Sequence, residues 1–394
     1  MKHTTGKRIF LFLIAASVTV LSLQSYPDQS AEKIKNGKIG KWKDNPQISL
    51  EFVRTIGETL SGDDNLLFYK PADIAFDGEG NIYVLDAGNH RVQKFSNDGK
   101  FISSFGRKGQ GPGEFQMPLS IDCDEKGWLY ISDAYNQRIG VYGSDGTLIE
   151  TLGMHENRAG PIRLMKDGLM LMGTGGIRSI SLGDPKASED FPKYLKVLDP
   201  SGIVKFTFGE KFNFKDMILN SVGNDYDFDI DRDGNIYSAF KYQNRIEKFS
   251  SSGKLLWQAS RELGYSTKPP KERSDTKVSG NQISVSIPRM NQCSNGIAVD
   301  DVGRVWVVGM KRQNIEDDSS KSRDPKEKPE EDSSATDLFQ LELYDTDGVL
   351  LHMFPLTHYV DGIRCHGDKI YLLDKNHTAQ FFEYRILEKR FAVK

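Results

Sequence analysis

The sequence has few cysteines: Cys123, Cys293 and Cys365 are the three in 394 residues. Such an odd and sparse set does not make a disulfide framework, and we expect buried thiols in strands. The formal net charge of −3 lacks the basic excess of a nucleic-acid-binding domain, so we expect no nucleic-acid partner. No glycine-rich loop leads into a helix, which excludes the usual phosphate-binding site. No serine, histidine and aspartate arrangement can be read from spacing, and we assign no catalytic residue.

The N-terminal region has the composition of a secretion signal. Lys2, Lys7 and Arg8 precede an apolar run over residues 9–23, shorter than the ~20 residues of a membrane-spanning helix. We predict a signal peptide or N-terminal anchor over residues 1–25, and a protein that is periplasmic, secreted or associated with the cell envelope. Membrane contact is expected only through an uncleaved N-terminus. Residues 26–47 are polar and rich in lysine, and we predict a linker there.

The most informative feature is a segment that occurs twice. Residues 74–106 and 121–153 align without gaps at an offset of 47 residues, so that Asp86 corresponds to Asp133 and Arg91 to Arg138. A period of about 40–50 residues with short strands and glycine turns is typical of β-propeller blades. Weaker copies follow, and the sequence predicts six blades of four antiparallel strands.

The sixth blade lacks a last strand of its own. Residues 48–57, ISLEFVRTIG, resemble FISSFG and LIETLG, the last strands of the first two blades. A strand from early in the chain can therefore complete blade six and remove the exposed sheet edges. We predict an all-β, six-bladed propeller over residues 48–391, with the ring closed by an N-terminal strand.

The repeated segment also carries a recognisable motif. The pattern D-x-x-N-x-R-[VI]-x-x-[FY] occurs at residues 86–95 and 133–142, and a glycine-rich connection follows the first copy at residues 106–118. In these features the chain resembles the NHL-repeat family of propellers, most clearly in blades one and two. Because the aspartate and arginine recur in successive blades, we predict a structural hydrogen-bonded pair rather than an active site.

The loops of one face are the predicted binding surface. If strands a to d run from the ring centre outward, the b–c turns and the d–a connections share a face, and the longer loops fall there. The candidates for ligand binding are turn or loop residues that differ between blades, since one site on a pseudo-symmetric ring needs asymmetry. They are His90, Arg107, Tyr135, Gln137, Tyr242, Gln243, Lys375 and His377. Residues 311–337 are highly charged and lack aromatics, which predicts a disordered insertion in blade five.

Two metal alternatives follow from resemblance to propeller enzymes. His90, His358 and His377 could share the loop face and hold zinc. The amidating lyases, which this chain resembles in its His90, use further histidines where Ala72 and Leu119 stand here. Gluconolactonase-like propellers hold a central divalent ion such as calcium, and the openings of strands a supply comparable groups, which we expect to line a solvated channel. These are Asp73, Ser120, Asp122, Asp227, Asp229 and Arg364.

The sequence therefore favours a binding protein over an enzyme. We expect a non-catalytic binding or scaffold propeller of the cell envelope, with a protein or small-molecule ligand on the b–c/d–a face. We expect no cofactor and no metal. The alternative is a metal-dependent propeller enzyme, similar to a lactonase or an amidating lyase, with zinc or calcium.

Overall fold

The computed structural model describes residues 31–59, 62–154, 159–174, 193–279, 282–314 and 336–389. The predicted signal peptide or anchor at residues 1–25 lies outside these ranges, as does most of the predicted insertion at residues 311–337. Residues 1–31 and Glu32–Lys394 are two separate compact units, and all the described strands belong to the second. Within the described ranges, no helix is both long and apolar enough to cross a membrane.

The fold is a six-bladed β-propeller, as predicted, with four antiparallel strands in each blade. Strands a to d of blade one are β3 (Asp73–Phe76), β4 (Ile82–Asp86), β5 (Arg91–Phe95) and β6 (Phe101–Phe105). Those of blade two are β9 (Pro118–Cys123), β10 (Leu129–Asp133), β11 (Arg138–Tyr142) and β12 (Leu148–Gly153). Those of blade three are β13 (Ile162–Leu164), β14 (Met170–Gly173), β15 (Leu195–Leu198) and β16 (Val204–Phe208). Blade four consists of β17 (Tyr226–Ile230), β18 (Ile236–Phe240), β19 (Ile246–Phe249) and β20 (Leu255–Arg261). Blade five consists of β23 (Ser294–Val299), β24 (Val305–Met310), β25 (Phe339–Tyr344) and β26 (Leu350–Pro355). Blade six consists of β27 (Gly362–His366), β28 (Lys369–Asp374), β29 (Gln380–Glu388) and β2 (Ile48–Ile56).

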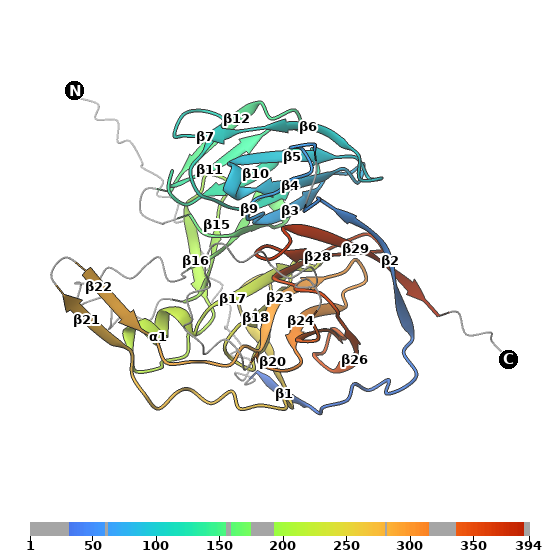
Figure 1. The fold of residues 1–394 in the computed structure, drawn as a ribbon, viewed down its shortest axis with the longest axis vertical. Helices are drawn as coiled ribbons and strands as arrows, with labels where there is room; N and C mark the ends of the chain where they lie inside the picture. Colours follow the sequence, from blue (N-terminus) through green and yellow to red (C-terminus); the bar gives the residue numbers. More distant parts are fainter. Residues whose placement is uncertain are drawn as a thin grey trace, which may run out of the picture. The chain divides into compact units, whose positions relative to one another are not determined.

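The N-terminal strand closes the ring, which confirms the prediction. β2 pairs antiparallel with β29 from Ile48 opposite Glu388 to Ile56 opposite Phe381, and Figure 1 shows the two strands side by side in blue and red. Ile48 and Ile56 are buried at the two ends of the strand, which fixes its register against the core. Strand β27 of blade six in turn contacts β3 of blade one.

Part of the predicted linker is instead paired with the propeller. Within residues 26–47, β1 (Glu32–Asn36) lies parallel to β20 and adds a fifth strand to blade four. The backbone N–H groups of Lys41 and Trp42 then donate to Leu350 and Leu351 on the outer strand of blade five. This N-terminal strap, residues 32–42, satisfies backbone groups that an outer strand would otherwise expose.

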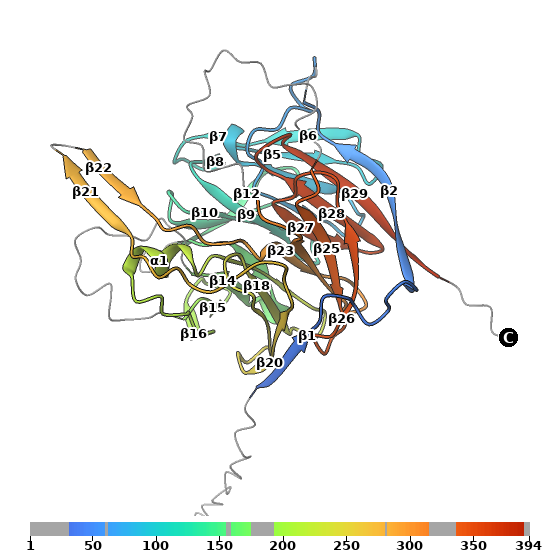
Figure 2. The same cartoon turned by 60° about the horizontal axis from the view of Figure 1, so that its bottom comes forward.

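Hydrophobic packing between neighbouring blades forms the core. Valines, leucines and aromatics of one blade pack against the next, as where Val84 and Phe95 of blade one meet Tyr371 and Phe381 of blade six. A short parallel pair, β7 (Arg107–Lys108) and β8 (Glu114–Phe115), lies in the connection to blade two. The hairpin of β21 (Asp275–Ser279) and β22 (Gln282–Ser286) projects from the blades in Figure 2, near the helix α1 (Met217–Val222). The described residues also include two single 3₁₀ turns, η1 (Ala87–Asn89) and η2 (Lys166–Gly168).

The repeated aspartate and arginine have structural roles, and in blade one they form the predicted pair. Asp86 pairs with Arg91 at 2.8 Å and accepts a hydrogen bond from the N–H of Tyr69. In blade two, Asp133 accepts from the N–H groups of Gln116 and Met117, while Arg138 donates to carbonyls of the glycine-rich connection. In both blades, these side chains therefore fix the loop that leads into the blade.

Candidate functional site

A central cavity of about 290 Å³ opens on the b–c/d–a face. All six blades contribute to its lining, mainly through the residues that open each strand a. Blades one to three supply the apolar side chains of Ala72, Leu119 and Pro161 together with the polar ones of Asp73 and Ser120. Blades four to six supply a polar side, on which Asp225, Lys241, Asn295, Asp361 and Lys375 lie. The lining is thus mixed, and both lysines come from blades four and six.

Ion pairs that cross the ring form the floor of this cavity. The buried carboxylate of Asp73 lies between Arg163 Nη1 at 3.1 Å and Arg364 Nε at 2.9 Å. Arg163 Nε also lies 3.7 Å from Asp229, and Arg364 Nη1 lies 3.8 Å from Asp227. These groups come from blades one, three, four and six, so the pairs link blades that are distant in the sequence.

The channel carboxylates also join each blade to the next. Asp122 accepts a hydrogen bond from the N–H of Leu164 in blade three, and Asp229 accepts from that of Val299 in blade five. Burial raises the pKa of Asp73, Asp122 and Asp227 and brings that of Asp229 to about 7, while Arg163 opposes the shift in each. The guanidinium groups of Arg163 and Arg364 thus lie among the carboxylates that we expected to line a solvated channel.

The mouth of the cavity repeats one arrangement in blades four and six. In both, an aspartate precedes strand a and a lysine follows strand b. The N–H of Lys241 donates to the backbone carbonyl of Asp225, and the N–H of Lys375 donates to the carboxylate of Asp361 at 3.0 Å. Asp225 is partly exposed, but desolvation by its surroundings still raises its pKa, and the two lysine ammonium groups oppose that rise. Both lysines thus act on the same carboxylate, from opposite sides of blade five.

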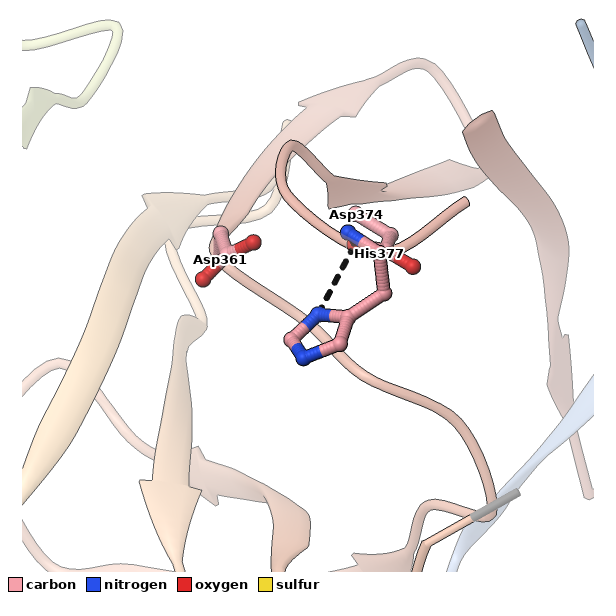
Figure 3. Close-up of side chains that lie close together, drawn as sticks. All are labelled: Asp361, Asp374 and His377. Carbon is pink, nitrogen blue, oxygen red and sulfur yellow. Dashed lines mark hydrogen bonds and ion pairs between the residues drawn. The ribbon is translucent and has the colours of Figure 1, made fainter. Parts of the chain in front are cut away.

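A cluster of Asp361, Asp374 and His377 lies beside this mouth (Figure 3). Their possible ligand atoms lie within 4.8 Å of one another, and His377 Nδ1 is 3.5 Å from Asp374. The oxygens of Asp374 already accept hydrogen bonds from the N–H groups of Asn376, His377 and Thr378 and from the Thr378 hydroxyl. The carboxylate therefore fixes the b–c turn of blade six, as Asp86 does in blade one, and we assign no metal to it.

The structure does not bring together the three histidines considered for zinc. Among the described residues, the one group of three metal-ligating side chains contains His377 but neither His90 nor His358. His377 stacks on Tyr359, with ring centroids 3.5 Å apart, and His358 packs against Phe382. These contacts place two of the imidazoles in separate aromatic pairs.

The predicted ligand-binding residues fall in several places. Lys375 lines the central cavity, whereas Tyr135 and Gln137 are exposed in the b–c turn of blade two. Arg107 is exposed but pairs with Glu114 at 2.8 Å within the glycine-rich connection. Gln243 donates to the carbonyl of Gly223 and so holds the connection into its own blade.

The other three candidates are turn residues that the central cavity does not include. His90 is in the left-handed conformation with φ = 56°, and its Nδ1 is buried without a partner among the described residues. Tyr242 is half-buried beside Lys241, and His377 caps the mouth cluster described above. Sequence reasoning missed polar lining residues that include Lys241, Asp225, Asn295 and Asp361.

Residues 48–258 match the model of a protein family described as a 6-bladed beta-propeller, DUF5128. The chain belongs to the DUF5128 family. The match covers more than half of the chain and agrees with the observed architecture. The likeness to NHL repeats remains one of motif, in the two blades that carry the aspartate and arginine. No curated protein matches the chain.

Solved structures share the fold of this DUF5128 protein at low identity. A DUF4221-family protein from Bacteroides vulgatus is 11% identical, with a TM-score of 0.54 over 87% of this chain and 99% of its own. A Bacteroides fragilis protein named as exported is 12% identical, with a TM-score of 0.52 over 92% and 100%. Virginiamycin B lyase from Staphylococcus aureus scores 0.45 at 10% identity, over 86% and 99%. The likeness to the two Bacteroides proteins shows the fold alone, and propellers host unrelated functions.

Proposed function

We propose that this chain is an exported, non-catalytic binding propeller that takes a small molecule into the central cavity of its b–c/d–a face. The observation that carries the proposal is the convergence of six blades on one cavity of mixed lining with charged and amide groups at its mouth. Cavities of this kind are the usual ligand sites of rigid scaffolds. The apolar run at residues 9–23, with its basic flank, supports export.

The floor of the cavity favours binding over metal-dependent catalysis. Where a gluconolactonase-like propeller would hold a divalent ion among carboxylates, the guanidinium groups of Arg163 and Arg364 lie instead. The two positions where the amidating lyases use histidine are Ala72 and Leu119, which add apolar side chains to the cavity lining. No observation specifically favours the enzyme alternative.

A cavity-filling variant tests this proposal. A Cβ on Gly362 would lie 3.5 Å from Lys375 Cε and 3.6 Å from Leu373 Cδ2, which is ordinary contact, so Gly362→Val should fold. The wild-type chain and this variant are incubated with a metabolite extract, and retained compounds are identified by mass spectrometry.

We expect a compound that the wild-type chain retains unchanged in mass and that Gly362→Val loses, with similar melting temperatures. Retention by both proteins would place binding elsewhere. Conversion of the compound to a product would support the enzyme alternative instead.

A further inference from the structure

The charges at the cavity mouth are mixed, and they restrict the kind of ligand. Lys241 and Lys375 lie on the same polar side as Asp225 and Asp361. Among the described residues, no ion pair within 4.0 Å engages either lysine, although both influence the pKa of Asp225. The mouth therefore holds donors and acceptors of opposite charge that are near one another but not in contact.

A ligand with a net charge would be opposed by half of this mouth. An anion would meet Asp225 and Asp361, and a cation would meet Lys241 and Lys375. The floor cannot compensate, because the carboxylates of Asp73 and Asp227 are already associated with Arg364. Bringing an unbalanced charge into such a partly buried site is costly.

A hydroxyl group satisfies both kinds of neighbour at once. It donates one hydrogen bond to a carboxylate and accepts others from an ammonium or amide group. Several hydroxyls at fixed spacing could thus bridge the gap between the lysines and the aspartates. Asn295 of blade five, whose amide donates to the carbonyl of Val360, also lines the cavity. Charge-assisted hydrogen bonds of this kind are stronger than neutral ones.

The opposite wall suits a ring with an apolar face. Ala72, Leu119 and Pro161 offer carbon atoms and no free charge. The volume of about 290 Å³ is at the lower end of ligand pockets and fits one six-membered ring with its substituents. We propose that the cavity binds one uncharged sugar ring, either free or at the end of a longer chain. This inference rests on the proposed function and specifies its ligand.

Saturation-transfer NMR with defined probes tests the ligand class on the purified full chain. The uncharged probes are D-glucose, D-galactose, D-mannose and N-acetyl-D-glucosamine. The charged probes are D-glucuronate and D-glucosamine, and glycylglycine serves as a zwitterion. We expect saturable binding of at least one uncharged sugar and binding of the charged probes weaker by about tenfold or more.

Two variants and one control locate the binding. Lys375→Met and Asp225→Asn should each weaken sugar binding about tenfold to a hundredfold, because each removes one charged hydrogen-bonding partner. Lys100→Met is the matched control: Lys100 lies in a c–d turn on the opposite face, with an exposed side chain. It should leave binding unchanged.

The outcomes separate the ligand class from the site. Failure of all four uncharged sugars, or equal binding of a charged probe, overturns the sugar proposal. If Gly362→Val no longer binds that charged probe, the central cavity remains the binding site and only the ligand class changes. If sugar binding survives in Gly362→Val, the central cavity is not the site, and the proposed function fails with it.

Discussion

Blades one and two differ from blades four to six in how they are held together. In the first pair, all four strands are contiguous in sequence, and Asp86 with Arg91 or Asp133 with Arg138 fixes the adjoining loop. In the second group, blade four takes an extra strand from residues 32–36 and blade six takes its last strand from residues 48–56. The same architecture is thus reached by local contacts in one half and by long-range contacts in the other.

The junction of blades four and five shows the difference most clearly. Arg261, at the end of β20, pairs with Glu342 at 2.6 Å and donates to the carbonyl of Cys293 in the connection that leads into blade five. Both side chains are almost completely buried. This arginine does for blade five what Arg138 does for blade two, but its carboxylate partner lies 81 residues away. Such a pair leaves no short motif in the sequence.

Removal of the borrowed strand should have the largest effect. A chain that lacks residues 1–57 leaves β29 without its antiparallel partner and exposes a long sheet edge, so we expect aggregation. A chain that lacks residues 1–47 loses only the strap and should remain folded with a lower melting temperature. A chain that lacks residues 1–31 keeps every paired strand and should match the wild type.

Size-exclusion chromatography and thermal melting distinguish the three truncations. A monomeric protein without residues 1–57, melting at the wild-type temperature, would show that β2 is dispensable. Blades four to six would then depend no more on contacts between distant parts of the sequence than blades one and two do.

Breaking the junction pair should be the next largest effect. Arg261→Met leaves the Glu342 carboxylate buried, with Tyr344 and Gln340 as its remaining side-chain partners among the described residues. Loss of one member of a buried pair typically costs about 3–5 kcal/mol, which denaturant unfolding would measure. The double variant Arg261→Met/Glu342→Leu should recover much of that loss. If the single variant lost less than 1 kcal/mol, the pair would not hold the two blades together.

The equivalent change in blade two should be smaller and local. Arg138 Nη2 donates to the carbonyls of Gly111 and Glu114, and the side chain is only half-buried. Arg138→Met should cost about 1–3 kcal/mol. Hydrogen exchange should accelerate mainly in residues 107–115, whereas in Arg261→Met it should accelerate across blades four and five. Equal spreading in both variants would remove the distinction between local and long-range clamps.

The pH dependence of folding stability tests the centre of the ring, where the strands a of all the blades meet. The pKa of Asp229 is about 7 in the folded chain and ordinarily 3.8, so the folded state gains a proton that the unfolded state does not bind between these pH values. Stability therefore rises as the pH falls from about 8 to 5. Asp229→Asn should flatten this dependence and add about 1 kcal/mol at pH 8.

The expected gain in folding stability is smaller than the pKa shift of Asp229 alone implies. The Asp229 side chain retains 13% of its exposure, and the variant loses the contact with Arg163. Thermal melting between pH 5 and pH 8 measures it. At pH 5 the two proteins should melt alike. A variant with the same pH profile as the wild type would show that another carboxylate carries the proton.

The sequence was sufficient to predict the six-bladed ring, but not the strap that pairs with its outer strands. Repeated turns and apolar alternation predicted six blades, and the likeness of residues 48–57 to other last strands predicted closure by β2. The strap was missed because residues 32–36 follow no repeat and pair with β20 through backbone groups. Its apolar contacts to the core come from the isolated Ile34 and Trp42. Its lysines suggested a solvated segment.

The candidate site was predictable in part. Asp73, Asp227 and Arg364 stood out because they open strands a, and all three line the cavity. Arg163 did not, because the repeat is degenerate in blade three and its partners come from other blades. Lys241 follows Phe240, which occupies the position of the motif aspartate, so the turn carried no signal. Which side chains meet at the centre depends on the closed ring, which no local pattern contains.

The pairing of β1 with β20 and of β2 with β29 also sets an order for folding. Both early strands must wait until residues 255–261 and 380–388 have been made. Blades one to three can form while these segments are still unpaired, because their strands are contiguous. Closing such long loops is slow compared with local hairpin formation. The strands that are synthesised first are thus paired late. A chaperone that shields residues 32–56 during synthesis would therefore act at the step on which ring closure depends.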